Sequence, residues 1–428
     1  MTKKMKNQRN ENFITTIFRL TLIFVIAAIP VATWAVAKDA PGRPASSDRA
    51  SPEAGFGEKS PEEIMKEKPR DTKIGALGDM SGELMDFGRE TANGAELAAD
   101  EVNAAGGVKG KEFDLLVFDT GGSVAGARQG VETFLKYKAV AVVGAATGEV
   151  SFAANKMINE NQLIMMSAGS RRRLGDTGPY NFRNSLNDSD GVDGLLDWVL
   201  KNRQWKRFAL FSSVVDDYSI QLNAVFKAEM IKRKMDITHE LYIWSNGMDS
   251  VLPEERGVVP QLKQMVGNPP DAVVFTGGPT EAADLIRELR KMGFNMPMLG
   301  FEDLMADEFL ELKDLAVGSV VYSGFDPKSA HPKTAAFVKN YTEKFGKAPT
   351  RLAALAYDSY HILAVALAKA QSLRPSHVRK ALMDIHDFDG VTGPTSIGQT
   401  REASKEPFIF EFRKDGGDYK FVNVKEVK

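Results

Sequence analysis

Two hydrophobic patterns alternate along the chain from residue 72 onward: short continuous apolar runs, and longer segments whose apolar residues recur with helical period. The apolar runs rich in β-branched residues are Ile74–Leu77, Phe113–Phe118, Ala139–Val143, Leu163–Met166, Phe208–Phe211, Ala272–Phe275 and Val317–Tyr322. Runs of this kind are typical of parallel strands that are buried on both faces. Two further strands are predicted near the C-terminus, at Phe408–Phe412 and Phe421–Val424.

The segments between these runs predict helices. They are Arg89–Ala104, Ala125–Tyr137, Phe152–Asn161, Gly191–Lys201, Ile220–Lys234, Glu281–Met292, Thr334–Phe345, Leu352–Ala370 and Ser376–Ile385. Strands that alternate with helices predict parallel sheets covered by helices on both faces, the doubly wound α/β class. Because 428 residues exceed what one such core usually holds, we expect two lobes.

The N-terminus has the pattern of a secretory signal peptide. Four basic residues come first: Lys3, Lys4, Lys6 and Arg9. The apolar stretch Leu20–Ala28 follows, and Ala35-Val36-Ala37 offers a small-residue cleavage site. We therefore predict that residues 1–37 are a signal peptide cut after Ala37. The alternative is a retained membrane anchor, since Leu20–Ala37 approaches the roughly 20 residues that span a bilayer.

The next segment, residues 38–71, has no sustained apolar period. It holds Pro41, Pro44, Pro52, Pro61 and Pro69 among small and charged residues. This composition predicts a disordered linker.

Composition excludes several kinds of site. The formal net charge is −2, which argues against a nucleic-acid partner, because phosphate binding needs clustered positive charge. The chain has no cysteine, which excludes disulfides, thiolate metal sites, cysteine nucleophiles and a lipidated N-terminal cysteine. No G-x-S-x-G elbow occurs, and none of the five histidines stands in a paired metal-binding motif. We expect no cofactor, no metal and no enzymatic activity.

The most informative segment joins the strand Ile74–Leu77 to the helix Arg89–Ala104. The loop Gly78-Asp79-Met80-Ser81-Gly82 lies at the carboxyl end of the strand, where open α/β sheets bind ligands. It has neither the G-x-G-x-x-G spacing nor a Gly-Lys-Ser/Thr ending, so it does not predict a nucleotide site.

This segment resembles the start of the type I periplasmic solute-binding proteins, in particular the branched-chain amino-acid-binding family of ABC importers. The matching pieces are the G-x-M-S-G loop, Phe87, Asn93-Gly94-Ala95-Glu96 and Asp100–Gly110. The resemblance extends over nearly all of residues 72–428. It implies two Rossmann-like lobes joined by three crossing segments.

The resemblance also implies how the chain is divided between the lobes. Lobe I is expected to comprise residues 72–187 with 325–394, and lobe II residues 188–324 with 395–428. The last crossing is expected at Val391-Thr392-Gly393-Pro394. Ala356–Tyr360 resembles the A-Y-D-A helix of the family, with Ser359 in place of the usual small apolar residue.

One wall of the site is expected to hold a ligand carboxylate. The glycine-rich loop after Val143 enters a helix, and backbone N–H groups at a helix N-terminus bind anions. The resemblance assigns ligand contacts here to Thr147 and Gly148, although close family members often have serine where Gly148 stands. It places a backbone carbonyl at Ala168 and a hydroxyl at Ser170, after the strand Leu163–Met166. The alternative for these residues is simple helix capping.

The opposite wall is expected to hold a ligand ammonium. Glu302 follows Leu299-Gly300-Phe301 and matches the acidic residue that binds this group in amino-acid binders. The alternative is an offset in this match, which would make Glu302 or Asp303 a solvated cap. Tyr218 matches an aromatic of the second lobe and Phe87 one of the first, and both are expected in loops. Ser81 completes the first-lobe wall.

Three nearby positions carry open alternatives. Asp188 matches an acidic position near the first crossing, where a structural role is an equal alternative. Gly278 replaces an aromatic of close relatives, which implies a wider pocket. Arg171-Arg172-Arg173 follows Ser170 directly. One of these arginines could pair with a second acidic group on the ligand, or the run could form a solvated basic lip.

These features predict an exported, non-enzymatic binding protein that captures an amino acid, or a similar small polar solute, between two hinged lobes. The expected partners are that small-molecule ligand and an ABC permease, and the expected location is periplasmic, or membrane-anchored if the signal is retained. One alternative is a ligand-sensing regulator of the same fold. Another is an interaction module similar to cell-wall synthase activators, which are commonly lipoproteins, so the absence of cysteine counts against it.

Overall fold

The computed structural model describes residues 59–82, 84–145, 147–214, 217–243 and 258–425. All of these residues belong to one compact structural unit. The predicted signal peptide and residues 38–58 of the predicted linker lie outside these ranges. Within the ranges, no helix combines the length and the apolar character needed to cross a bilayer.

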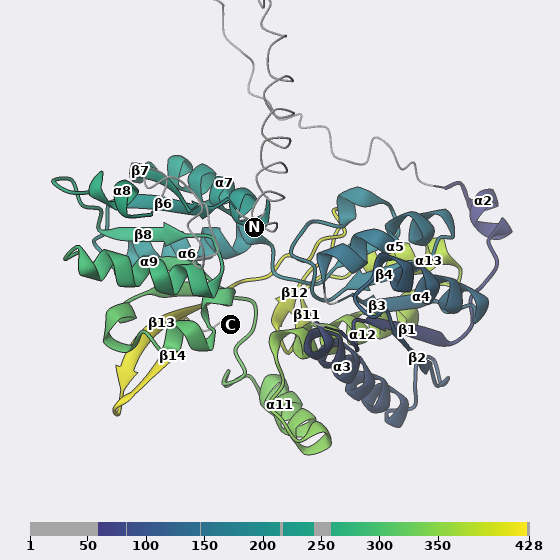
Figure 1. Cartoon of the computed structure of the whole chain (residues 1–428). Helices are drawn as coiled ribbons and strands as arrows, with labels where there is room; N and C mark the ends of the chain where they lie inside the picture. Colours follow the sequence, from purple (N-terminus) through teal and green to yellow (C-terminus); the bar gives the residue numbers. More distant parts are fainter. Residues whose placement is uncertain (1–58, 83, 146, 215–216, 244–257, 426–428) are drawn as a thin grey trace, which may run out of the picture. The chain divides into compact units, whose positions relative to one another are not determined.

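The sheet of lobe I has five parallel strands (Figure 1). Their order is β2 (Asp114–Asp119), β1 (Lys73–Gly78), β3 (Ala141–Gly144), β4 (Ile164–Ser167) and β5 (Asn181–Arg183). The register pairs Leu77 with Gly144 and Val143 with Met166, so the carboxyl ends of β1, β3 and β4 lie level. The loops that follow these three strands therefore meet at one edge of the sheet.

Helices cover both faces of this sheet. One layer holds α3 (Met85–Ala104), α12 (Arg351–Lys369) and α13 (Pro375–Met383), and the other holds α4 (Val124–Lys136) and α5 (Gly148–Glu160). A further helix, α11 (Pro332–Phe345), packs on α3. The central strands β3 and β4 are buried along their whole length, whereas the edge strand β2 is partly exposed and begins and ends with an aspartate.

The sheet of lobe II has seven strands. Their order is β14 (Asp418–Lys425), β13 (Phe408–Asp415), β10 (Val320–Ser323), β9 (Met298–Phe301), β8 (Ala272–Phe275), β6 (Arg207–Ser213) and β7 (Asp236–Ile243). The hairpin formed by β13 and β14 pairs antiparallel with β10, and the other strands are parallel. The hairpin is yellow in Figure 1.

Alternate residues of the lobe II strands enter two separate cores. Phe208 and Leu210 of β6 pack with α6 (Asp188–Asn202) and α7 (Asp217–Lys232). Phe211 of the same strand packs on the other side with Leu285. That side is covered by α8 (Val258–Lys263), α9 (Pro279–Lys291) and α10 (Asp307–Leu310). The two-residue period of a strand explains this division.

The chain passes between the two sheets after β5, after β10 and before β13. Asp358 of α12 holds the turn of the short hairpin β11 (Phe388–Gly390) and β12 (Gly393–Thr395), because its carboxylate accepts from the Val391 and Thr392 backbone N–H groups at 2.9 Å each. The third crossing comes later than expected. Ile397 and Ala403 lie in the lobe I core, so the chain leaves that lobe after Ala403 and not at residue 395.

The C-terminal part of the predicted linker is helical. Residues Pro61–Lys66 form α2, which Ser60 and Glu63 cap reciprocally. The Arg70 N–H donates to the Leu373 carbonyl, and the Ser376 N–H donates to the Glu67 carboxylate, both at 3.0 Å. The expectation of disorder therefore fails for this stretch, because a capped helix and its polar contacts attach it to lobe I.

Two further expectations were wrong in detail. Phe87 and Tyr218 were expected in loops, but α3 begins at Met85 and α7 at Asp217, so both aromatics lie in the first turn of a helix. The hydrophobic pattern of the sequence did not predict the elements β5, β7, β11, β12 and α8. Most of them are short, and β7 exposes much of one face.

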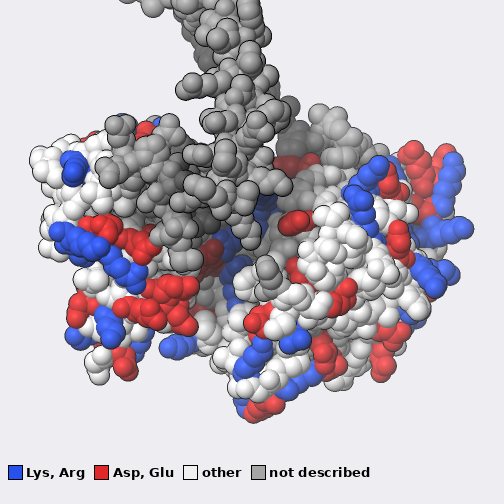
Figure 2. Space-filling view, viewed as in Figure 1, with Lys and Arg blue, Asp and Glu red and all other residues white. Residues whose placement is uncertain are grey.

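Charges of both signs lie interspersed on the face shown in Figure 2. Basic and acidic side chains alternate there in small patches over the described residues, in keeping with the net charge of −2.

Candidate ligand-binding site

A cavity of about 1170 Å³ is formed by residues of both lobes. Lobe I contributes Phe87, Thr147, Gly148, Glu149, Phe152, Gly169, Arg171, Arg172, Thr350, Arg351 and Leu352. Lobe II contributes Tyr218, Pro279, Glu302, Asp303 and Met305. Of the predicted site residues, Phe87, Thr147, Gly148, Tyr218 and Glu302 line it, whereas Ser81, Ala168 and Ser170 do not.

The N-terminus of α5 forms one wall of the cavity. Thr147 is the N-cap residue and Gly148 the first residue of the helix, so the first-turn N–H groups lack helical partners. Both residues line the cavity, which makes this wall suited to an anion. The Ser151 hydroxyl, in the first turn of α5, is buried and donates to the Thr147 carbonyl at 2.7 Å, so it is used inside the helix.

Ala168 and Ser170 lie behind this wall. Both are fully buried. The Ala168 carbonyl accepts from the Ser185 hydroxyl at 3.1 Å, and the Ser170 hydroxyl donates to the Arg172 carbonyl at 2.9 Å. Their polar groups therefore fix the shape of the loop after β4. Ser81 is exposed in the loop after β1. Against the effect of burial, hydrogen bonds from Gly121, Ser81 and Met80 lower the pKa of the neighbouring Asp119.

Glu302 lies directly after β9 on the opposite wall. Its Oε2 accepts from the Ser323 hydroxyl at 3.1 Å and the Gly324 N–H at 3.0 Å. Its Oε1 lies 2.9 Å from Nε of Arg351, which starts α12 on the other lobe. Sequence reasoning missed Arg351, because the helix was expected to begin at Leu352. A single arginine at the start of an otherwise apolar helix was the available signal.

The arginine run is divided between the cavity and solvent. Arg171 lines the cavity and pairs with Asp303 of lobe II, so the solvated-lip interpretation is wrong for this residue. Arg172 also lines it, with Nη2 at 3.6 Å from Oδ2 of Asp217. Only Arg173 points elsewhere, toward Asp176 of its own lobe at 3.4 Å.

The guanidinium of Arg171 lies over two aromatic rings. It is 5.1 Å from the ring centre of Tyr218 and 5.2 Å from that of Phe301. The two rings themselves pack edge to face at 5.8 Å. Guanidinium groups are attracted to such ring faces, so this floor positions the Arg171 charge in the cavity.

The hydroxyl of Tyr218 makes a hydrogen bond to a buried carboxylate. It donates to Oδ1 of Asp188 at 2.8 Å. Burial raises the pKa of Asp188, against the hydrogen bond from Tyr218, and burial also raises the pKa of Tyr218. The structure therefore shows a structural contact for Asp188, which holds the Tyr218 ring in place.

The remaining positions fit a wide cavity. Phe87 is half exposed. Gly278 precedes the lining residue Pro279, and a Cβ added to it would meet only Glu281 Oε2, at 3.8 Å. The absence of an aromatic side chain at this position leaves space next to the lobe II wall.

A buried arginine supports the loop that carries Arg171. Arg183 of β5 pairs with Glu402, and both side chains are almost fully buried. Its Nη1 donates to the carbonyls of Ser170 at 3.1 Å and Arg171 at 3.3 Å. Glu402 accepts in addition from the backbone N–H groups of Leu174 and Gly175. Sequence reasoning missed this pair, since its members are far apart in the chain.

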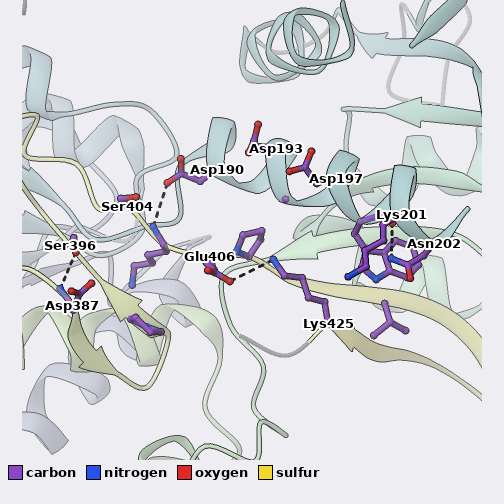
Figure 3. Close-up of a pocket in the computed structure, with 16 residues that line it drawn as sticks. Asp190, Asp193, Asp197, Lys201, Asn202, Asp387, Ser396, Ser404, Glu406 and Lys425 are labelled. Carbon is purple, nitrogen blue, oxygen red and sulfur yellow. Dashed lines mark hydrogen bonds and ion pairs between the residues drawn. The ribbon is translucent and has the colours of Figure 1, made fainter. Parts of the chain in front are cut away.

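A second cavity, of about 730 Å³, is lined by α6, β14 and the third crossing (Figure 3). Two of its carboxylates, Asp193 and Asp197, pair with Arg233, which does not line the cavity. Lys425 lies 3.7 Å from Glu406. Over the residues that the structure describes, no cluster of three or more His, Asp or Glu could hold a metal ion. The first cavity, at the carboxyl ends of the strands, is therefore the better candidate for a ligand site.

Two sheets of this topology, with a cavity that carries charged groups at the carboxyl ends of strands from both lobes, define a two-lobed solute-binding protein. The periplasmic binding protein family matches residues 71–417, and the chain belongs to that family. The predicted fold class and the predicted resemblance are thereby confirmed.

Individual relatives agree with this assignment. The chain is 25% identical to Leu/Ile/Val-binding protein homolog 3 of Brucella melitensis, over 80% of this chain and 91% of the relative. It is similar to the branched-chain amino acid transporter substrate-binding protein LivJ of Streptococcus pneumoniae in complex with isoleucine. The identity is 27%, the TM-score is 0.64, and the match covers 82% of this chain and 99% of LivJ. The leucine-binding protein LivK of Thermotoga maritima is 26% identical with a TM-score of 0.66, and the match covers 82% of this chain and 97% of LivK.

Proposed function

We propose that this protein is the substrate-binding component of an ABC importer, that it captures an amino acid in the cavity of about 1170 Å³, and that it delivers this ligand to a membrane permease. The observation that carries the proposal is the pairing of opposite recognition chemistries on the two walls. Lobe I offers the free N–H groups at the start of α5, and lobe II offers the carboxylate of Glu302.

Each wall suits one end of a zwitterion. The ligand carboxylate binds the N-terminus of α5 at Thr147 and Gly148, where the helix dipole also favours negative charge. The ligand ammonium binds Glu302, whose orientation is fixed by the Ser323 and Gly324 donors. Charge-assisted hydrogen bonds of this kind are strong in a site that excludes water.

The aromatic side chains complete the site. Phe87 covers the ligand from lobe I, and the Tyr218 ring supports the lobe II side. Ser81, Ala168 and Ser170 shape the loops behind the lining. Closure of the lobes about the three crossings brings both walls onto the ligand, and the closed form is the one that the permease recognises.

The proposal includes export. Residues 1–37 direct the chain out of the cytoplasm, in keeping with its family and with the basic, apolar and small-residue pattern of the N-terminus.

A thermal-shift panel of the common L-amino acids tests the proposal. A ligand at a hundredfold excess over its Kd stabilises the folded protein by about 2.7 kcal/mol, which gives a clear rise in Tm. Glu302→Gln keeps the shape of the side chain and is expected to abolish the rise. Glu311→Gln, at an exposed position of the same lobe, is the matched control and is expected to bind like wild type. Wild-type binding by Glu302→Gln would show that Glu302 does not hold the ammonium.

A further inference from the structure

We infer that the ligand of this site carries a second acidic group, bound by Arg171, and is therefore an acidic amino acid. The inference rests on the proposed function and names the class of amino acid. It starts from three ion pairs that link the lobes around the cavity: Arg171–Asp303, Arg172–Asp217 and Arg351–Glu302.

In each of these pairs the cation belongs to lobe I and the carboxylate to lobe II. Most of the surface that lines this cavity is apolar, as is usual for small-ligand sites, and a few charged groups are placed on it. Arg171 and Arg172 line the cavity in addition to the groups that are proposed to bind the two ends of the zwitterion. Such charges need a partner when they are half-buried, and carboxylates of lobe II serve as that partner, Asp303 for Arg171 and Asp217 for Arg172.

Arg171 is the fixed member of its pair. Its guanidinium lies over the rings of Tyr218 and Phe301, and its backbone carbonyl is held by Arg183. Asp303 lies in a short turn after β9, its side chain is 31% exposed, and Arg171 is the one partner that the described residues provide for its carboxylate. Asp303 therefore has one contact to give up, whereas Arg171 keeps its contacts with the two rings.

A ligand carboxylate can therefore replace Asp303. A guanidinium binds a carboxylate through two parallel N–H donors. The partly exposed pair of Arg171 and Asp303 is weak by comparison, so a ligand carboxylate displaces Asp303 once the lobes exclude water. Asp303 then marks where the second acidic group of the ligand binds. L-glutamate and L-aspartate have this chemistry in addition to the α-ammonium that Glu302 requires. A dicarboxylate without an amine shares the acidic groups but lacks the ammonium.

Isothermal titration of the exported chain tests the inference with L-glutamate, L-aspartate, L-glutamine, L-leucine, L-lysine and glutarate. We expect the preferred acidic amino acid to bind at least tenfold tighter than L-glutamine, L-leucine and L-lysine. Glutarate is expected to bind at least tenfold more weakly than L-glutamate, and equal binding of the two would overturn the amino-acid part of the inference.

Three variants assign the preference to its residue. Arg171→Met keeps a long side chain over the rings and is expected to reduce the glutamate-to-glutamine ratio to about one, while L-glutamine still binds. Asp303→Asn removes the competing carboxylate and is expected to strengthen glutamate binding severalfold. Arg173→Met, whose arginine pairs with Asp176 outside the cavity, is the matched control and is expected to keep the wild-type ratio.

The outcomes separate this inference from the proposed function. Preferential binding of L-leucine or L-lysine, or an unchanged ratio in Arg171→Met, overturns the inference and leaves amino-acid capture standing. If none of the amino acids gives a heat of binding or a rise in Tm, both are wrong.

Discussion

Glu302 and Arg351 belong to different lobes, and Oε1 of Glu302 lies 2.9 Å from Nε of Arg351 on the wall of the candidate ligand cavity. The side chains of Glu302 and Arg351 are 17% and 21% exposed, so both groups are more protected than in an ordinary surface ion pair. The residue predicted to bind a ligand ammonium is thus already occupied by a cation of the protein. A ligand that enters the cavity has to share or displace this contact.

The coupling between these two residues is measurable in the absence of ligand. We expect a double-mutant cycle of Glu302→Gln and Arg351→Met to give a coupling energy of about 1 kcal/mol in urea unfolding, the upper end for partly exposed pairs. The exposed pair Lys156–Glu160, at 3.8 Å, is the control and is expected to give at most about 0.5 kcal/mol. Equal coupling in the two cycles would show that the position of the cavity pair gives it no additional strength.

The buried pair of Arg183 and Glu402 should matter far more for folding. Removing one charge leaves the other buried without a partner, which typically costs about 3–5 kcal/mol. We expect Arg183→Met and Glu402→Gln each to lower the free energy of unfolding by an amount in this range, and the double variant to lose less than their sum. Additive losses in denaturant titrations would contradict a direct pairing.

Arg183→Met should also weaken ligand binding in the protein that remains folded. The carbonyls of Ser170 and Arg171 lose a donor in this variant, so the loop that carries Arg171 is less well fixed. We expect a lower affinity with an unchanged stoichiometry in titration calorimetry, under conditions where circular dichroism shows a folded protein. Wild-type affinity would mean that the loop is held by other contacts.

Stability should depend on pH through Lys405. Burial lowers the pKa of this lysine to about 8, against the nearby Asp358 carboxylate, and its Nζ donates to the Thr392 hydroxyl at 2.6 Å. Between about pH 8 and the ordinary lysine value near 10.4, the unfolded chain binds one proton more than the folded one. The free energy of unfolding therefore rises with pH in this window, by up to about 1.4 kcal/mol per unit from this group.

Comparison with Lys405→Met isolates the contribution. We expect the difference in unfolding free energy between variant and wild type to favour the variant at pH 7 and to shrink between pH 8 and pH 10. The exposed Lys201 provides the control, and Lys201→Met should show no such trend. A difference that stays constant with pH would place the lysine titration outside this window.

The glycine at the start of α5 offers a gain-of-affinity test. A Cβ added to Gly148 would have Ser170 Oγ as its nearest neighbour, at 3.7 Å, so a small side chain fits. Gly148→Ser adds a hydroxyl at the proposed carboxylate site, where the resembling family often has serine. We expect affinity for the bound amino acid to increase about tenfold, the effect of one additional hydrogen bond to a charged group. Gly148→Ala supplies the Cβ without the hydroxyl, and an equal gain with alanine would contradict the hydroxyl contact.

Much of the architecture could be predicted from local patterns. Strands such as Ala272–Phe275 are continuous apolar runs because both faces are buried, and helices such as Pro279–Lys291 carry an apolar face beside a charged one. Elements without a strong period were missed, as with Asp236–Ile243, whose residues are mostly half-exposed. The first turns of α3 and α7 were missed because their residues, including Phe87 and Tyr218, belong to the ligand cavity or its floor rather than to a regular core face.

The sequence by itself determined which loops follow strand ends, and hence that Thr147, Gly148 and Glu302 lie at the carboxyl edges of two sheets. Those relations depend on neighbours along the chain. Only the tertiary structure decided which charges meet: Arg351 with Glu302, Arg171 with Asp303, and Arg183 with Glu402. An ion pair has no signature in sequence spacing when its partners lie on separate elements, because its geometry depends on how those elements pack.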